Sequence, residues 1–459
     1  MAQPRHWLAV PGRPGGRGDE APGGGRCRHP GNGQREGRPT VGRIRGARKG
    51  QYLLRLLVTE GLLRSFQVRN YRFFWASNTS VRFAEQMQLL VLSYFVRTEI
   101  SSVFLLGLFG ALRFGGTLFG AAYGVVVERS NRRLLLIGVR LTVSILSATI
   151  LLLVVTGRLE PWHVFIITGL GGLTRAFDNI TKQTMLADVM RKEELINAMA
   201  LDRTGSDASQ IVGPLLGGLM LRRFGMGPAF VVIVAVYLLA VFCALFVRPV
   251  NPVKAEKQPS MWRSLVEGGD YIRRHDAVLA LLLFAFLINL AAFPLTHGMM
   301  PVFALDVLHT GPMGLAALTS AVAAGAFIGS FGLAAKGGFA KPGVMAVLAV
   351  VSWCMSIMVF TQSSWMAVSL AILLASGVAQ SFSLVSVDSL LLRLAPLELR
   401  ARIMGIRSMA VYGLPMGLLA IGAMADILGA PRALAIMAAA GAVLTLVISA
   451  WLRELWSAS

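Results

Sequence analysis

The chain alternates long apolar stretches with short polar ones, and each apolar stretch is about as long as a bilayer is thick. From residue 73 onward, apolar runs of roughly 20 residues recur, the length with which an α-helix crosses a hydrocarbon core about 30 Å thick. This pattern predicts an all-α integral membrane protein with twelve transmembrane helices. The predicted spans are residues 73–96, 103–127, 134–156, 162–186, 200–221, 228–247, 277–302, 312–335, 342–361, 364–392, 402–425 and 431–452.

One long polar stretch divides the spans into two equal sets. Residues 248–276 contain three prolines and charges of both signs, and we assign them to a cytoplasmic linker. The linker separates two predicted six-helix bundles, an arrangement that places a substrate path between them. The bundles are residues 73–247 and 277–452, with a lead-in at 51–72 and a C-terminus at 453–459.

Residues 1–50 differ from the rest of the chain. They hold 11 lysines and arginines against 3 acids and show no apolar periodicity, a composition that predicts a disordered basic tail. A start codon placed too far upstream is the alternative that we favour, because no methionine occurs between Met1 and Met87. Eight of the 21 net positive charges lie in this tail, so the charge does not indicate a nucleic-acid-binding protein.

The charges between the spans set the expected orientation. If the N-terminus is cytoplasmic, 17 lysines and arginines lie on the cytoplasmic side and 5 on the other. Because positive residues are retained in the cytoplasm, we expect both termini there. The expected location is the cytoplasmic membrane of a bacterium.

A group of charged residues lies between the second and third spans. Its members are Gly124, Glu128, Arg129, Arg132 and Arg133. The glycine allows two helices to approach closely, and the acid can pair with an arginine or meet the positive end of a helix. The group resembles the G-x-x-x-D-R-x-G-R-R motif of the major facilitator superfamily, with Glu128 replacing the aspartate and Asn131 a glycine. The resemblance implies a cytoplasmic gating motif.

The fifth span contains a second motif. Gly213, Pro214, Gly217 and Gly218 resemble the GPxxGG core that marks exporters within this superfamily. Proline kinks the helix and the glycines permit close packing. Ala200 and Ser209 occupy two upstream positions that are glycine in the full motif. The alternative is a kinked helix that says nothing about transport direction.

Longer stretches are similar to the superfamily branch that contains enterobactin exporters and macrolide efflux proteins. They run from Phe177 to Lys182, from Leu195 to Ala198, and from Ala395 to Gly405. The resemblance covers about residues 68–452. It implies proton-coupled export of a drug, siderophore or metabolite.

Ionisable residues inside the spans are expensive and are therefore candidates for function. Arg82 and Glu85 are three residues apart in the first span, so they share a helix face and can pair. One interpretation makes Glu85 the proton carrier, because burial favours the protonated carboxyl whereas Arg82 favours the carboxylate. The alternative is a self-neutralising structural pair.

Further charges lie in other spans. Arg113 and Arg140 are deep enough to need partners. Arg175 is expected to face a cavity and to meet an anionic substrate or Glu85. Asp178 and Lys182, four residues apart, are predicted to pair near the cytoplasmic end of the fourth span. The remaining transport candidates are the acids Asp207 and Asp388.

No pattern indicates an enzyme. The sequence has no phosphate-binding glycine loop with lysine and no paired metal ligands, so we expect neither ATP nor a metal nor another cofactor, and the proton gradient is the expected energy source. We expect a monomer whose partners are a small-molecule substrate and the lipid bilayer, without nucleic acid. The alternatives are an importer or facilitator of the same fold, and a membrane sensor or assembly factor that transports nothing.

Overall fold

The structure is a computed structural model that describes residues 62–191, 194–248, 269, 271–336, 341–396 and 399–452. The predicted tail at 1–50 and the C-terminus at 453–459 lie outside these residues, as do half of the lead-in and most of the linker.

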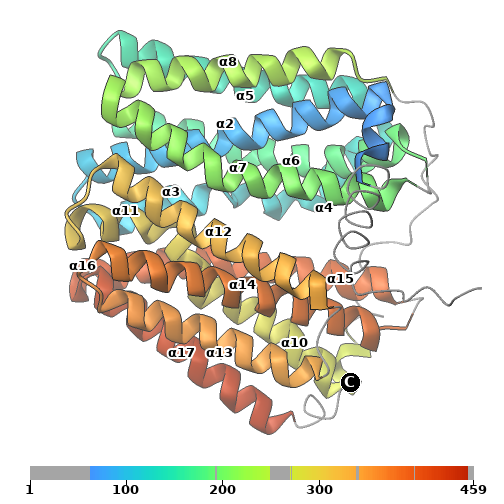
Figure 1. Cartoon of the computed structure of the whole chain (residues 1–459), viewed down its shortest axis with the longest axis vertical. Helices are drawn as coiled ribbons and strands as arrows, with labels where there is room; N and C mark the ends of the chain where they lie inside the picture. The colour runs from blue at the N-terminus through green and yellow to red at the C-terminus, as the bar shows by residue number, and fades with distance from the viewer. Residues whose placement is uncertain are drawn as a thin grey trace, which may run out of the picture. The chain divides into compact units, whose positions relative to one another are not determined.

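The described helices coincide with the predicted spans within a few residues. In the N-terminal bundle they are α2 (Arg69–Glu99), α3 (Val103–Leu112), α4 (Gly120–Arg129), α5 (Arg132–Val155), α6 (Pro161–Val189), α7 (Leu195–Phe224) and α8 (Met226–Leu245). In the C-terminal bundle they are α10 (Asp276–Leu287), α11 (Met300–Val302), α12 (Pro312–Lys336), α13 (Pro342–Thr361), α14 (Met366–Leu394), α15 (Arg400–Met409), α16 (Gly413–Leu428) and α17 (Ala430–Trp451). Figure 1 shows the two sets as separate layers of helices.

Eight helical segments of the described residues are long and apolar enough to cross a membrane. The four predicted spans outside this set are α2, the α3–α4 pair, α6 and α7. Three of these helices are 29 to 31 residues long but carry charged residues, which lower their hydropathy. The α3–α4 pair is interrupted by a 3-10 segment at Gly115–Phe119. These four spans belong to the N-terminal bundle, where the charged site lies.

The seventh span is irregular along most of its length. After α10 the helix widens into π-helical turns at Ile288–Ala292, Leu295–Met299 and Phe303–Val307. Pro294 and Pro301 lie between these turns, and a proline removes the N–H that would continue regular α-helical hydrogen bonding. This irregular span contacts α2 and α3 of the other bundle.

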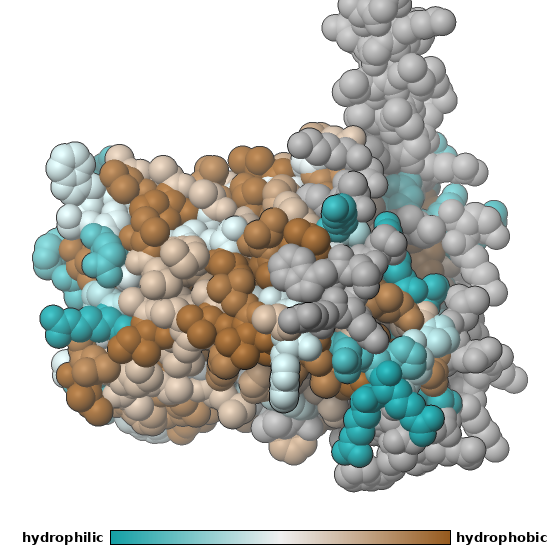
Figure 2. Space-filling model, turned by 90° about the horizontal axis from the view of Figure 1, so that it is seen from below, coloured by the Kyte–Doolittle hydropathy of each residue, from teal (hydrophilic) through white to brown (hydrophobic). Residues whose placement is uncertain are grey.

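The two ends of the bundles differ in charge. We call the end that carries Arg132, Arg133 and Arg400 the basic end, and the end that carries Arg97 and Asp306 the far end. Figure 2 shows apolar side chains across the middle of one face, with hydrophilic side chains gathered toward both ends. Many large apolar residues on the helices are exposed, which fits a surface that faces lipid.

The bundles pack against each other along two glycine-lined seams in the far half. The first joins α7 to α12, where a Cβ built on Gly218 would lie 2.6 Å from the Ala316 Cβ. The second joins α3 to α16, where a Cβ on Gly107 would lie 2.5 Å from the carbonyl oxygen of Leu418. Both distances are too short for any residue but glycine. Figure 1 shows α7 and α12 diverging from their seam toward the basic end.

Polar contacts also join the two bundles at the far end. Arg97 at the end of α2 forms an ion pair of 2.6 Å with Asp306 of the seventh span. Asp426 of α16 accepts hydrogen bonds from the Val103 amide (2.7 Å) and the Ser102 hydroxyl (2.9 Å). A carboxylate at a helix N-terminus is favourable, so one bundle caps a helix of the other. The far end is closed in this conformation.

Candidate functional site

A charged cavity of about 90 Å³ lies inside the N-terminal bundle. Residues of α2, α3, α5, α6 and α8 line it, and most of its wall is apolar. The substrate path was predicted to lie between the bundles, whereas this cavity lies within one of them. The charged lining residues are Arg82, Glu85, Arg113, Arg140, Arg175 and Asp178.

Glu85 is the centre of the charged cavity. Its carboxylate lies 2.9 Å from the Arg82 guanidinium of the same helix and 2.9 Å from that of Arg175 on α6. A third guanidinium, from Arg113, is 3.9 Å away. The Arg82–Glu85 contact matches the predicted i, i+3 pair, and Arg175 meets Glu85 as expected. Three cations against one anion leave two positive charges without a counter-charge in this cluster.

Phe114 connects the arginines to the C-terminal bundle. The guanidinium carbon of Arg175 lies 5.3 Å from the centre of the Phe114 ring, and that of Arg113 lies 6.0 Å from it. On its other side the ring lies 5.5 Å from the ring of His297 in the seventh span. Because cations are attracted to aromatic faces, Phe114 stabilises the two arginines where the bundles meet.

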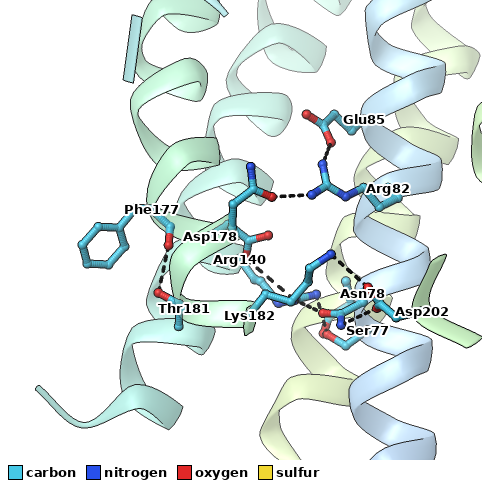
Figure 3. A network of polar contacts seen from close by, with 12 residues as sticks. Ser77, Asn78, Arg82, Glu85, Arg140, Phe177, Asp178, Thr181, Lys182 and Asp202 are labelled. Carbon is cyan, nitrogen blue, oxygen red and sulfur yellow. Dashed lines mark hydrogen bonds and ion pairs between the residues drawn. The ribbon is translucent and has the colours of Figure 1, made fainter. Parts of the chain in front are cut away.

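A second polar layer lies closer to the basic end, and Figure 3 shows how its side chains converge. Arg140 of α5 is 1% exposed and donates to the Ser77 hydroxyl at 2.8 Å and to the Asn78 side-chain oxygen at 2.5 Å. Its counter-charge is Asp178, at 3.7 Å. A buried guanidinium requires this many partners, because an unpaired buried charge is very costly.

The predicted pair between Asp178 and Lys182 is wrong. Lys182 instead forms an ion pair of 3.1 Å with Asp202 of α7, which also accepts a hydrogen bond of 2.9 Å from Asn78. The four-residue spacing does place Asp178 and Lys182 on one face of α6. The neighbouring helices α5 and α7 bring a buried arginine and a second acid to that face, so each residue pairs across helices.

We expect double-mutant cycles to detect this exchange of partners. Asp178→Asn leaves Arg140 buried without its carboxylate, a change of the kind that costs about 3–5 kcal/mol. The coupling between Asp178 and Arg140 should therefore exceed about 1 kcal/mol, whereas Asp178 and Lys182 should be additive within about 0.5 kcal/mol. Unfolding of the single and double variants in detergent measures both couplings. Strong coupling to Lys182 would show that the predicted pair was right.

Asn78 and Asp202 were not among the predicted site residues. A signal for Asn78 was present, because Asn78, Arg82 and Glu85 follow i, i+4, i+7 spacing and form one polar stripe on α2. Asp202 had no comparable signal within α7. Its role depends on which helix packs beside α6, and spacing within one helix does not reveal that.

The predicted gating motif lies at the basic end, and two of its arginines make contacts between helices. Arg132 contacts both carboxylate oxygens of the buried Asp188 on α6, at 2.7 and 2.8 Å. Arg133 donates to the carbonyl oxygen of Leu245 at 2.7 Å, and the Asn131 side chain caps α5. These contacts bind α5 to α6 and α8. Glu128 and Arg129 lie in the last turn of α4, and their predicted pairing stays a prediction.

The expectation that Gly124 allows two helices to approach closely is wrong in this conformation. A Cβ built on Gly124 would meet no atom within 4 Å among the described residues. Close helix approach therefore does not require a glycine here, because α4 is not tightly packed at this point.

The glycines of the α7 motif do lie at close contacts. Cβ atoms on Gly213 and Gly217 would lie 2.9 Å from the Gln86 Cβ and 3.1 Å from the Met87 Cγ of α2. Gly218 forms the seam with α12, and Pro214 lies inside the helix between them. The motif thus packs α7 against a helix of each bundle.

The two remaining acids lie away from the charged cavity. Asp207 pairs at 3.0 Å with Arg203, whose side chain is 74% exposed. Asp388 of α14 pairs at 2.7 Å with Arg407 of α15, in the other bundle. The structure does not bring either acid to Glu85.

Solved transporters share this architecture. A bacterial homologue of the human lysosomal transporter Spinster, in an inward-facing and occupied conformation, superposes with a TM-score of 0.64 at 14% identity, over 86% of this chain and 97% of that one. The nucleoside transporter NupG superposes with a TM-score of 0.66 at 12% identity, over 83% and 99%. Likeness at this identity concerns the fold alone.

The sequence comparisons point the same way. Macrolide efflux protein A of Enterococcus faecalis is 22% identical over 226 residues, which are 49% of this chain and 70% of that protein. Its counterpart from Streptococcus pyogenes is 20% identical over 270 residues, 58% of this chain and 66% of that protein. The family model of the Major Facilitator Superfamily matches residues 74–420. The predicted resemblance is confirmed: the chain belongs to the Major Facilitator Superfamily of membrane transporters.

Proposed function

We propose that this protein exports small organic molecules across a bacterial cytoplasmic membrane by alternating access, with the proton gradient as its energy source. It acts as a monomeric transporter, without enzymatic chemistry, a cofactor or nucleic acid. Both termini are cytoplasmic, so the basic end faces the cytoplasm. The observation that carries this proposal is the closed far end, where two bundles meet along glycine seams.

The arrangement of the seams supports alternating access. The Arg97–Asp306 ion pair and the Asp426 cap are far-end contacts between bundles, and both consist of groups that water can also satisfy. Such contacts are modest in strength, so the bundles can separate there at low cost. With the basic end in the cytoplasm, this conformation is inward-facing, the state from which an exporter loads its substrate.

Export is supported by two separate observations. The relatives that match over about half of this chain are named as macrolide efflux proteins. The glycines of the α7 motif pack tightly on α2 and α12, so the exporter motif is part of the seam between the bundles. Small organic molecules are therefore the proposed substrates.

Glu85 is the proposed proton carrier. In this conformation two guanidiniums contact its oxygens at 2.9 Å, which favours the carboxylate. An inward-facing antiporter has just released its proton to the cytoplasm, so an ionised acid fits this stage of the cycle. Asp207 and Asp388 are secondary candidates, each held by one arginine.

Transport by the full-length chain in inside-out membrane vesicles tests the proposal. With a panel that includes erythromycin and amphipathic organic acids, we expect the transported compounds to accumulate in the lumen when the lumen is acidified, and to leak out when the gradient is collapsed. An Asp426→Lys variant tests the role of the far-end contacts. It places a cation at the N-terminus of α3, which weakens closure of the far end, so vesicles that contain it should accumulate less.

Three other results would contradict the proposed proton-driven export. Accumulation in right-side-out vesicles would indicate an importer. Transport that is independent of the gradient would indicate a facilitator. Absence of flux across a broad panel, with normal protein levels, would favour a sensor or assembly factor.

A further inference from the structure

We propose that the charged cavity binds an oxyanion group of the transported molecule, such as a carboxylate, sulfonate or phosphate, between Arg113 and Arg175. This inference rests on the proposed export function and narrows its substrates to organic acids. It follows from charge balance, from hydrogen-bonding capacity and from the shape of the cavity.

The charge balance of the cavity lacks an anion. Arg82, Arg113 and Arg175 surround the single carboxylate of Glu85, at 2.9, 3.9 and 2.9 Å. The neighbouring Arg140 is matched by its own partner Asp178 and does not alter the balance. Like charges this close repel strongly in a medium of low dielectric constant. A dianion that enters beside Glu85 would offset both remaining positive charges, and a monoanion would offset one of them.

Donor groups for such an anion are already in place. The Nη1 atoms of Arg113 and Arg175 are buried and have no hydrogen-bond partner among the described residues. The side chain of Arg113 is only 10% exposed, and its ion pair with Glu85 is the longest in the cluster. The buried hydroxyl of Thr168 also has no partner in the described part of the chain. All three residues line the cavity, and guanidinium groups match oxyanions in geometry.

The size and walls of the cavity suit the head of an amphipathic acid. Its volume of about 90 Å³ holds a small oxyanion but not a drug-sized molecule. Leu89 lines both this cavity and a second one of about 20 Å³ between the bundles, which His297 also lines. The apolar body of a substrate can therefore extend from the charged cavity toward the interface that opens and closes during transport.

The same charges exclude the opposite class of substrate. An amine that entered this cavity would meet two uncompensated positive charges, while the Glu85 carboxylate already contacts two arginines and Asp178 is paired with Arg140. Cations are therefore disfavoured here. Selection for acids distinguishes this protein from a transporter that recognises its drug as an amine.

Binding to the purified full-length chain tests the proposal. Three probes share one ring system: naphthylacetate, its neutral amide and naphthylethylamine. Calorimetry should show the acid binding at least about tenfold more tightly than the amide, because a charged hydrogen bond to arginine is lost in the amide. The amine should show no measurable binding.

Variants identify the groups that bind the acid. Arg113→Gln and Arg175→Gln should each weaken naphthylacetate binding about tenfold or more, and Arg113→Lys should give an intermediate loss. Arg223→Gln, which removes an exposed arginine at the end of α7, should change the affinity less than about twofold. Glu85→Gln should bind the acid more tightly, and the acid should raise its melting temperature more than that of the wild type. Equal binding of acid and amide, or unchanged binding by both glutamine variants, overturns the proposal.

Two further arms separate the sources of the anion. Binding of sulfate without any binding of naphthylacetate would indicate a site for inorganic anions only and would overturn the proposal. Displacement of naphthylacetate by phosphatidylglycerol in nanodiscs, with no transport of the acid, would indicate a lipid site. Transport of erythromycin without any binding of acids would refute this inference and leave the export proposal intact. Acid binding without any transport would support this inference about the cavity and refute the export proposal.

Discussion

Replacing Glu85 with glutamine should abolish uphill export and lower the stability of the protein. The variant leaves Arg82, Arg113 and Arg175 facing one another inside the membrane without a carboxylate. Loss of one partner from a buried ion pair costs about 3–5 kcal/mol, so we expect a clear fall in the unfolding midpoint in detergent. Proton-driven accumulation should also disappear, because glutamine binds no proton.

A second substitution separates the loss of stability from the loss of proton coupling. Glu85→Gln combined with Arg82→Gln restores the net charge of the cluster, so stability should recover to near the wild-type value. Uphill transport should stay absent, whereas downhill exchange of substrate across proteoliposomes should return. Glu85→Asp should retain partial activity with a shifted pH profile. Uphill transport by the double variant would rule out Glu85 as the proton carrier and leave it a structural residue.

Most of the fold was predictable because the residues of each span are enough to identify it as a transmembrane helix. A run of about 20 apolar residues suffices to identify a transmembrane helix, and every predicted span coincides with described helix. The details that differ depend on contacts between helices. The break at Gly115–Phe119 lies where the 3-10 segment approaches α6 so closely that a Cβ on Gly116 would clash with the carbonyl oxygen of Gly172. An apolar pattern does not contain that information.

The candidate site was predictable only in part, because it also depends on contacts between helices. The pair of Arg82 and Glu85 is local to one helix, and its spacing of three residues revealed it. Assembly of three arginines from α2, α3 and α6 around one acid depends on the order in which helices pack. The partner of Asp178 was likewise mistaken because a residue on a neighbouring helix was closer than the one four positions away. Helical spacing identifies candidates, and packing selects among them.

Gly218→Ala should open the far end of the protein. The new Cβ would lie 2.6 Å from the Ala316 Cβ and 2.8 Å from the Pro312 carbonyl oxygen, so α7 and α12 must separate. Overpacking of this kind costs about 1–3 kcal/mol, enough to shift a two-state equilibrium about 5-fold to 150-fold away from the far-end-closed state. Spin labels on Glu99 and His309, both exposed at the far end, should report a longer distance in the variant.

The matched control is Gly138→Ala on α5, where a Cβ would meet no atom within 4 Å among the described residues. It should leave the label distances unchanged, because alanine is favoured over glycine in a helix and needs no extra space here. Adding Ala316→Gly to Gly218→Ala removes the closest clash and should restore part of the closed population. An unchanged distance distribution in Gly218→Ala, with the protein folded, would show that the α7–α12 seam does not control closure. The exporter motif would then act only as a packing element within α7.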